Sequence, residues 1–221
     1  MSLLVEIIKY VSIVVIGLLP IMNPLTTIPI YMSLTKRMSA ENKRAQARKA
    51  CIYAFSILIV FMLLGNGIIS LFSISMPGIR VAGGIIIMIL ALRMIFSGED
   101  TSSEVDAAPV DIKKADLDYS FSPLAMPSLA GPGSIAVVMS FSSQVPTDHN
   151  VLGYIIIAIG IAIVVGIAYV ALSSASWIEK ALGEHGMQAV TKIMGFLLTC
   201  VAVQFLASGV RDFVIEFSKF S

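Results

Sequence analysis

Three prolines interrupt the first apolar segment of the chain within Pro20-Ile21-Met22-Asn23-Pro24-Leu25-Thr26-Thr27-Ile28-Pro29. A second stretch with the same P-x3-P-x4-P spacing lies 103 residues later, Pro123-Leu124-Ala125-Met126-Pro127-Ser128-Leu129-Ala130-Gly131-Pro132. Proline lacks a backbone donor and clashes with the preceding turn, so both stretches are predicted to break a helix. At membrane depth, a broken backbone is tolerated only where protein or a water-filled cavity satisfies it. Paired breaks in the two halves of a membrane chain therefore predict a binding site between the halves.

The composition predicts an integral membrane protein. The chain is 57% hydrophobic and 13% charged, with a mean hydropathy of +0.92, whereas a soluble domain is about half apolar and about a quarter charged. A formal net charge of +1 provides no basic field, so we expect no nucleic-acid partner. The apolar segments contain no nucleophile–base pair, no phosphate-binding loop and no cluster of metal ligands. We therefore expect no enzyme, no catalytic residue, no metal and no cofactor.

Six segments are long and apolar enough to span a bilayer as helices of about 20 residues. They cover residues 5–33, 50–72, 78–97, 121–142, 151–176 and 188–210. The predicted loop after the first span carries the densest basic cluster of the chain, Lys36, Arg37, Lys43, Arg44, Arg48 and Lys49. Because Lys and Arg mark cytoplasmic loops, this loop should face the cytoplasm. Both termini and the loop Gln144–Asn150 should then face the periplasm, as in a multi-pass protein of a bacterial inner membrane.

The six spans divide into two membrane repeats, residues 1–97 and 120–221, joined by the acidic segment 98–119. That segment has the composition of a solvated cytoplasmic linker, although a regulatory or partner-binding role stays open. The third and sixth spans match at an offset of 111 residues through Gly84 and Gly195, Ala91 and Ala202, and Ser97-Gly98 and Ser208-Gly209. An odd number of spans in each repeat inverts the second relative to the first. The predicted fold is therefore all-α, with two inverted three-helix repeats and broken first and fourth helices.

The proline stretches supply the candidate substrate site. Asn is a strong N-cap and Pro is favoured at the first helical position, so Asn23-Pro24 should begin a new half-helix. Gly131-Pro132-Gly133-Ser134 should begin a second one. Helix N-termini offer unpaired N–H groups that suit a carboxylate. The candidate substrate-binding residues are Asn23, Pro24, Thr26, Thr27, Pro127, Gly131, Pro132, Gly133 and Ser134. The alternative is that these prolines only kink packed helices.

Three motifs together resemble the MarC family of bacterial inner-membrane proteins. They are Asn23-Pro24-Leu25-Thr26-Thr27-Ile28-Pro29, Pro77-Gly78-Ile79-Arg80-Val81-Ala82-Gly83-Gly84 and Pro123-Leu124-Ala125-Met126-Pro127-Ser128-Leu129-Ala130-Gly131-Pro132-Gly133. The resemblance covers the whole chain and its six-span layout. The family is named for multiple antibiotic resistance, is related to LysE-type exporters and includes members described as neutral amino acid transporters. At Thr26 this chain departs from the Gly that many members carry.

The sequence therefore favours a transporter of small polar molecules, such as an amino acid, within the lipid bilayer. An oligomer is compatible with the sequence. Two other functions stay open: a non-transporting membrane assembly or stress-related factor that binds a partner through the acidic segment, and drug efflux. A transporter needs a hydrated cavity that reaches the proline breaks, a scaffold would pack them dry, and drug efflux would be supported by a large apolar cavity.

Overall fold

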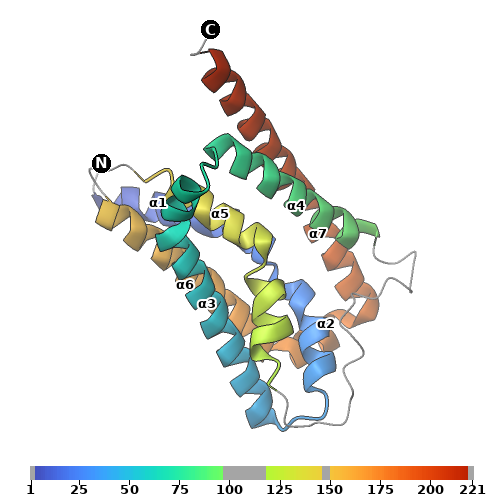
Figure 1. The fold of residues 1–221 in the computed structure, drawn as a ribbon. Helices are drawn as coiled ribbons and strands as arrows, with labels where there is room; N and C mark the ends of the chain where they lie inside the picture. The colour runs from blue at the N-terminus through green and yellow to red at the C-terminus, as the bar shows by residue number, and fades with distance from the viewer. Residues whose placement is uncertain (1–2, 97–117, 146–149, 219–221) are drawn as a thin grey trace.

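The computed structural model describes residues 3–96, 118–145 and 150–218, and all the regular elements in these ranges are helices (Figure 1). In chain order they are α1 Leu3–Met22, α2 Pro24–Thr35, α3 Ala40–Leu71, α4 Met76–Phe96, η1 Ser120–Leu129, α5 Pro132–Ser142, α6 Asn150–Ser173 and α7 Ala175–Ser218. Five helices are each long and apolar enough to cross a membrane, and η1 with α5 would make a sixth span. The prediction of an all-α integral membrane fold is confirmed.

The first and fourth spans are broken where the prolines predict a break. Helix α1 ends at Met22 and α2 begins at Pro24, with Asn23 between them in the left-handed backbone region at φ 35°. The π-type helix η1 ends at Leu129, α5 begins at Pro132, and the pair is bent by 60°. Both new helices thus begin with proline at the first position, where its fixed φ fits and its missing N–H costs nothing.

The two breaks do not fall at matching prolines of the P-x3-P-x4-P spacing. The first half restarts at its second proline, Pro24, whereas the second half restarts at its third, Pro132. The two helix starts, Asn23-Pro24 and Gly131-Pro132, are therefore 108 residues apart, whereas the shared proline spacing has an offset of 103 residues. The proline stretches mark the segments that contain the breaks, and which of their residues are equivalent stays a prediction.

The second span is longer than the sequence predicts and contains most of the basic cluster. Helix α3 begins at Ala40, not at residue 50, so only residues 36–39 connect α2 to α3. Lys, Arg, Gln, Glu and Ala are strong helix formers, which explains why a segment too polar for the bilayer continues the helix. We call the end of the bundle that carries Lys36, Arg37, Lys43, Arg44, Arg48 and Lys49 the basic end.

The last span is also longer than predicted, because α7 runs over Ala175–Ser218 instead of 188–210. Gly183, at φ 62° and ψ 179°, breaks the helical path inside α7 near the basic end. Glycine adopts this backbone conformation without the steric cost that other residues pay. The segment Ala175–Leu182, predicted to be mostly loop, is therefore a short helical piece that precedes the long one. Figure 1 shows α7 running alongside α4 toward the end of the bundle where both termini lie.

Only the last two residues of the acidic segment 98–119 lie within the described residues, and both are tied to α3. Lys49 Nζ lies 2.8 Å from a carboxylate oxygen of Asp118, and the backbone N–H of Tyr119 donates to Gln46 Oε1 at 3.1 Å. Asp118 also accepts bonds from the N–H and hydroxyl of Ser120, the first residue of η1. The start of the second half is thus anchored to the first half at the basic end. The limits predicted for the two repeats and the linker stay predictions.

Helix α5 lies in the middle of the bundle and packs on α1, α3 and α4 through small residues. A Cβ placed on Gly17 would lie 2.9 Å from Phe141, one on Gly65 would lie 3.1 Å from Met139, and one on Gly83 would lie 3.0 Å from Ala136. Membrane helices often associate through such small residues. Lipid tails are as apolar as helix surfaces, so the hydrophobic effect does not drive the association, and close van der Waals packing does.

Helices α4 and α7 pack with a reciprocal register. A Cβ on Gly84 would lie 3.1 Å from the carbonyl oxygen of Ala202, and a Cβ on Gly195 would lie 3.0 Å from that of Ala91. These are the two residue pairs that match at the offset of 111, each facing the other's counterpart. Reciprocal contacts of this kind are expected across a two-fold axis. The register supports an inverted repeat, which as a relation between whole halves stays a prediction.

Candidate functional site

The break between α1 and α2 buries a polar side chain that is only partly satisfied. Asn23 is 2% exposed, and its Nδ2 donates to the sulfur of Met94 in α4 at 3.7 Å. Its Oδ1 has no hydrogen-bond partner among the described residues. The predicted side-chain cap is wrong, since Asn23 occupies the N-cap position of α2 but makes no side-chain capping bond. With a left-handed backbone at Asn23, the side-chain amide bonds to Met94 and does not cap α2.

The two threonines after the break behave differently. Thr26 is satisfied locally, because its hydroxyl donates to the Asn23 carbonyl oxygen at 2.9 Å. Thr27 is 1% exposed, and its hydroxyl has no partner among the described residues. Most buried polar groups in proteins are paired, so two unpaired polar atoms within one turn of a helix break call for a functional explanation. Asn23 Oδ1 and Thr27 Oγ1 are together called the unpaired polar pair.

The second break is closed by its own backbone. A Cβ on Gly131 would lie 2.5 Å from the carbonyl oxygen of Pro127, so no larger residue fits there without a shift. The hydroxyl of Ser134 is buried and donates to the carbonyl oxygen of Leu129 at 3.1 Å. Pro127 and Pro132 are both exposed. Gly131 thus allows a close approach, as the sequence predicts. The group that approaches it is the backbone of Pro127 in the same chain.

The two breaks come near each other around α4. A Cβ on Gly133, in the first turn of α5, would lie 3.1 Å from Ile21 at the end of α1 and 3.4 Å from Ile87 of α4. Met94, the partner of Asn23, lies two turns further along α4. Asn23, Pro24, Thr27, Gly131, Gly133 and Ser134 are all buried. Since the contact between the breaks is apolar and closed in this conformation, the substrate role of these residues stays a prediction.

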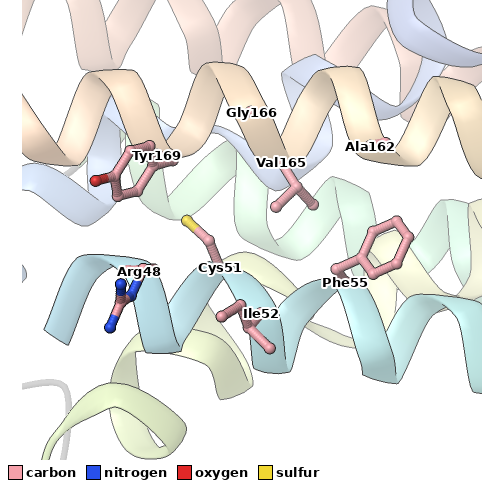
Figure 2. A pocket seen from close by; sticks show the side chains of 8 residues that line it. All are labelled: Arg48, Cys51, Ile52, Phe55, Ala162, Val165, Gly166 and Tyr169. Atoms are coloured by element: carbon pink, nitrogen blue, oxygen red, sulfur yellow. The ribbon is translucent and has the colours of Figure 1, made fainter. Parts of the chain in front are cut away.

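Two cavities lie elsewhere, at and near the basic end. The first, of about 390 Å³, is an apolar groove between α3 and α6 (Figure 2). It is lined by Arg48, Cys51, Ile52, Phe55, Ala162, Val165, Gly166 and Tyr169. The second, of about 270 Å³, is more polar than the first and lies where α2, α3, the end of α6 and the start of α7 meet. It is lined by Tyr31, Met32, Thr35, Met38, Ala40, Lys43, Arg44, Leu172, Ser173, Ala175 and Ser176.

Comparisons with known proteins assign the chain to a family. The profile described as "MarC family integral membrane protein" matches residues 8–214. The chain belongs to the MarC family. Proteins named inner membrane protein MarC from Citrobacter koseri and Salmonella typhimurium are each 32% identical over 217 residues, which covers 96% of this chain and 98% of theirs. The protein of the same name from Escherichia coli O1:K1 / APEC is 31% identical over 220 residues, with the same coverage. No solved structure matches the chain.

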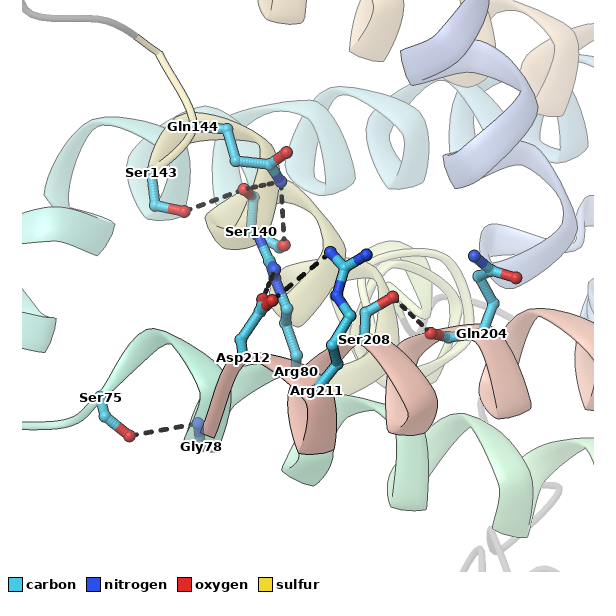
Figure 3. Close-up of polar contacts among 10 residues, drawn as sticks. All are labelled: Ser75, Gly78, Arg80, Ser140, Ser143, Gln144, Gln204, Ser208, Arg211 and Asp212. Atoms are coloured by element: carbon cyan, nitrogen blue, oxygen red, sulfur yellow. Dashed lines mark hydrogen bonds and ion pairs between the residues drawn. The ribbon is translucent and has the colours of Figure 1, made fainter. Parts of the chain in front are cut away.

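In this MarC-family chain, sequence reasoning missed an ion pair between α4 and α7. A guanidinium nitrogen of Arg80 contacts a carboxylate oxygen of Asp212, and the two side chains are 21% and 24% exposed. Arg211 lies 3.5 Å from the other oxygen of Asp212 but is 73% exposed, and Figure 3 shows both arginines directed at that carboxylate. Asp212 lies beyond the predicted end of the sixth span. Arg80 lies within the Pro77–Gly84 motif, but no sequence pattern links it to Asp212, which is 132 positions away.

Proposed function

We propose that this protein is an inner-membrane transporter of small polar metabolites, with neutral amino acids as the best candidates. The observation that carries the proposal is the unpaired polar pair, Asn23 Oδ1 and Thr27 Oγ1, both almost fully buried. A buried polar atom without a partner costs about 1–3 kcal/mol. Such a cost is reasonable at a site whose partner is a ligand, and it is unexplained if the break is only a packed kink.

The kind of ligand follows from the groups around the break. The pair offers an amide oxygen and a hydroxyl, and no charged side chain of the described residues hydrogen-bonds to either one. The start of α2 adds the partial positive charge of a helix N-terminus. A hydroxyl and an amide can bind an ammonium or hydroxyl group, while a helix N-terminus suits a carboxylate. A zwitterion combines both requirements in one small molecule.

The conformation described here corresponds to a closed state of the proposed cycle. Asn23 is held by Met94 of α4, and Gly133 packs against Ile21 and Ile87. Opening the site would separate α4, with its partner α7, from the two breaks. A thioether sulfur is a weak hydrogen-bond acceptor, so a substrate could replace Met94 as the partner of the Asn23 amide.

The proposed orientation places the basic end in the cytoplasm and both termini in the periplasm. The six basic residues between positions 36 and 49 support it through the positive-inside rule. Labelling of single cysteines with an impermeant reagent in intact cells tests it, in a background that lacks Cys51 and Cys200. A cysteine at Ser39 should be protected and one at Ser143 should react. The reverse result would overturn the orientation.

The transport experiment uses purified protein in proteoliposomes and a panel of radiolabelled amino acids and related metabolites. Asn23→Ala should weaken uptake of a transported substrate about 5–150-fold, since it leaves a polar group of the ligand unpaired. Asn42→Ala, at an exposed position of α3, is the matched control and should leave uptake unchanged. Equal uptake by Asn23→Ala and wild type would move the site away from the break. Extrusion of a cationic dye without uptake of any polar metabolite would replace the proposal with drug efflux, and the absence of both activities would favour a non-transporting role.

A further inference from the structure

We propose that the basic end holds one molecule of an anionic phospholipid, with an acyl chain in the apolar groove between α3 and α6 and the phosphate in the polar cavity beside it. This site is separate from the helix breaks and does not depend on the transport proposal. An apolar groove and a more polar cavity carry the inference, since they lie next to each other at one end of a membrane protein.

The groove has the shape and chemistry of an acyl-chain site. Its walls are the apolar faces of α3 and α6, and Figure 2 shows Cys51, Val165 and Phe55 in the space between the two helices. Ala162 and Gly166 form an exposed trough one turn apart on α6, and a Cβ on Gly166 would meet nothing within 4 Å. Ile52 is 55% exposed at the lip. A groove that opens sideways from a membrane helix pair admits a chain from the bilayer.

The polar cavity has the charge that a phosphate requires. Lys43 and Arg44 line it together with the hydroxyl-bearing residues Tyr31, Thr35, Ser173 and Ser176. Arg48 lines the adjoining end of the groove. Within the described residues, none of these three cations forms an ion pair. Basic pockets between helices at a membrane surface are the sequence-readable sites of anionic headgroups.

The two cavities lie next to each other along α3 and α6. Arg44 in the cavity and Arg48 in the groove are one turn apart on α3, as are Ser173 and Tyr169 on α6. Tyr31 lines the polar cavity and donates to the Lys43 carbonyl oxygen at 2.8 Å. Trp177, next to Ser176, is 72% exposed. An exposed tryptophan is typical of the membrane–water interface, which is where a headgroup lies.

A lipid fits this arrangement better than a free anion does. A soluble phosphate or carboxylate would use only the 270 Å³ polar cavity and would leave the 390 Å³ apolar groove unexplained. A phospholipid uses both, because its acyl chain can fill the apolar groove while its phosphate lies among the basic residues of the polar cavity.

The test is native mass spectrometry of the full chain, released from detergent after equilibration with equal amounts of phosphatidylglycerol and phosphatidylcholine. We expect one phosphatidylglycerol adduct to persist on the wild type. Gly166→Leu fills the groove and Lys43→Gln with Arg44→Gln removes the phosphate partners, so each variant should lower that adduct about tenfold. Gly67→Leu, also at an exposed glycine with open space, and Lys9→Gln with Lys192→Gln are the matched controls and should retain it.

Three results would overturn the proposal. The first is equal retention of both lipids by the wild type, and the second is an unchanged adduct in both cavity variants. The third is protection by inorganic phosphate: if phosphate in a phosphatidylcholine background raises the unfolding temperature as much as phosphatidylglycerol does, the polar cavity binds a soluble anion and not a lipid. Because Gly166 faces open space, a properly folded Gly166→Leu variant is expected, and its unfolding temperature confirms this before the adducts are compared.

Discussion

The side-chain amide of Asn23 donates to the sulfur of Met94 at 3.7 Å, and this bond links the break in the first span to the last turn of α4. The same side chain leaves its oxygen unpaired, one turn from the unpaired hydroxyl of Thr27. A polar group held by one weak bond and otherwise unsatisfied is poised to exchange partners. The unpaired polar pair is therefore the part of the break on which the transport proposal rests.

Thr27→Val is predicted to leave the protein as stable as the wild type or slightly more stable, while it impairs transport. Valine has nearly the shape of threonine and removes a buried hydroxyl that has no partner, so no hydrogen bond within the fold is lost. Unfolding temperature in detergent and uptake in proteoliposomes are the two measurements. Thr199→Val removes a hydroxyl that bonds within α7 and is the control. A loss of stability without loss of uptake would assign Thr27 a structural role.

Gly131→Ala is predicted to destabilise the protein by about 1–3 kcal/mol, because the added methyl group meets the Pro127 carbonyl oxygen at 2.5 Å. Gly67→Ala, which faces open space, should cost less. The comparison is made by thermal unfolding in detergent. The clash lies within the helix break itself. Loss of transport in a variant with a bulky residue at 131 could therefore result from a distorted bend, and it would not by itself identify a substrate site. An unfolding temperature unchanged by Gly131→Ala would contradict the close backbone approach.

Asp212→Asn is predicted to destabilise the contact between α4 and α7 by about 1–3 kcal/mol, since it leaves Arg80 without its main partner in a setting that is largely shielded from water. The swap of Arg80→Asp with Asp212→Arg should restore part of that stability. Lys49→Gln breaks an ion pair that is half exposed and should cost less than about 1 kcal/mol. Equal effects of Asp212→Asn and Lys49→Gln would show that the Arg80 pair is no better shielded than the surface pair.

Acid is predicted to loosen the anchor between Asp118 and α3. The hydrogen bond from Lys49, followed by that from Ser120, lowers the pKa of Asp118 from 3.8 to about 2. A lowered pKa means that the contribution to folding is complete above about pH 4 and is lost as the pH falls through about 2. Because the pair is half exposed, the effect should stay below about 1 kcal/mol. The unfolding temperature of Asp118→Asn should change less between pH 4 and pH 2 than that of the wild type.

The two halves are predicted to superpose through a two-fold axis in the membrane plane, with Pro24 on Pro132 and Gly84 on Gly195. The positions of the two helix starts and the reciprocal register of α4 and α7 support this alignment. An experimentally determined structure would test it by superposing residues 3–96 on 118–218. If α3 does not fall on α6 when the two breaks are aligned, the halves are not related by inversion.

The sequence by itself determined the membrane class, the family and the two places where helices break. These features depend on composition and on proline, whose effects on the backbone are local. It misplaced the limits of α3 and α7, because helix-forming polar residues extend a helix beyond the apolar segment that marks a span. The equal proline spacing did not reveal which proline begins the new helix, which is the second proline of the first stretch and the third of the second.

Only the tertiary structure decided which groups meet. The contacts of Asn23 with Met94, of Arg80 with Asp212 and of Gly84 with Ala202 each join residues more than 70 positions apart. The same packing left Thr27 without a partner and set an apolar groove beside a basic cavity. The reason is that helix packing depends on how side chains from separate helices interdigitate. The order of residues along the sequence does not show which side chains meet.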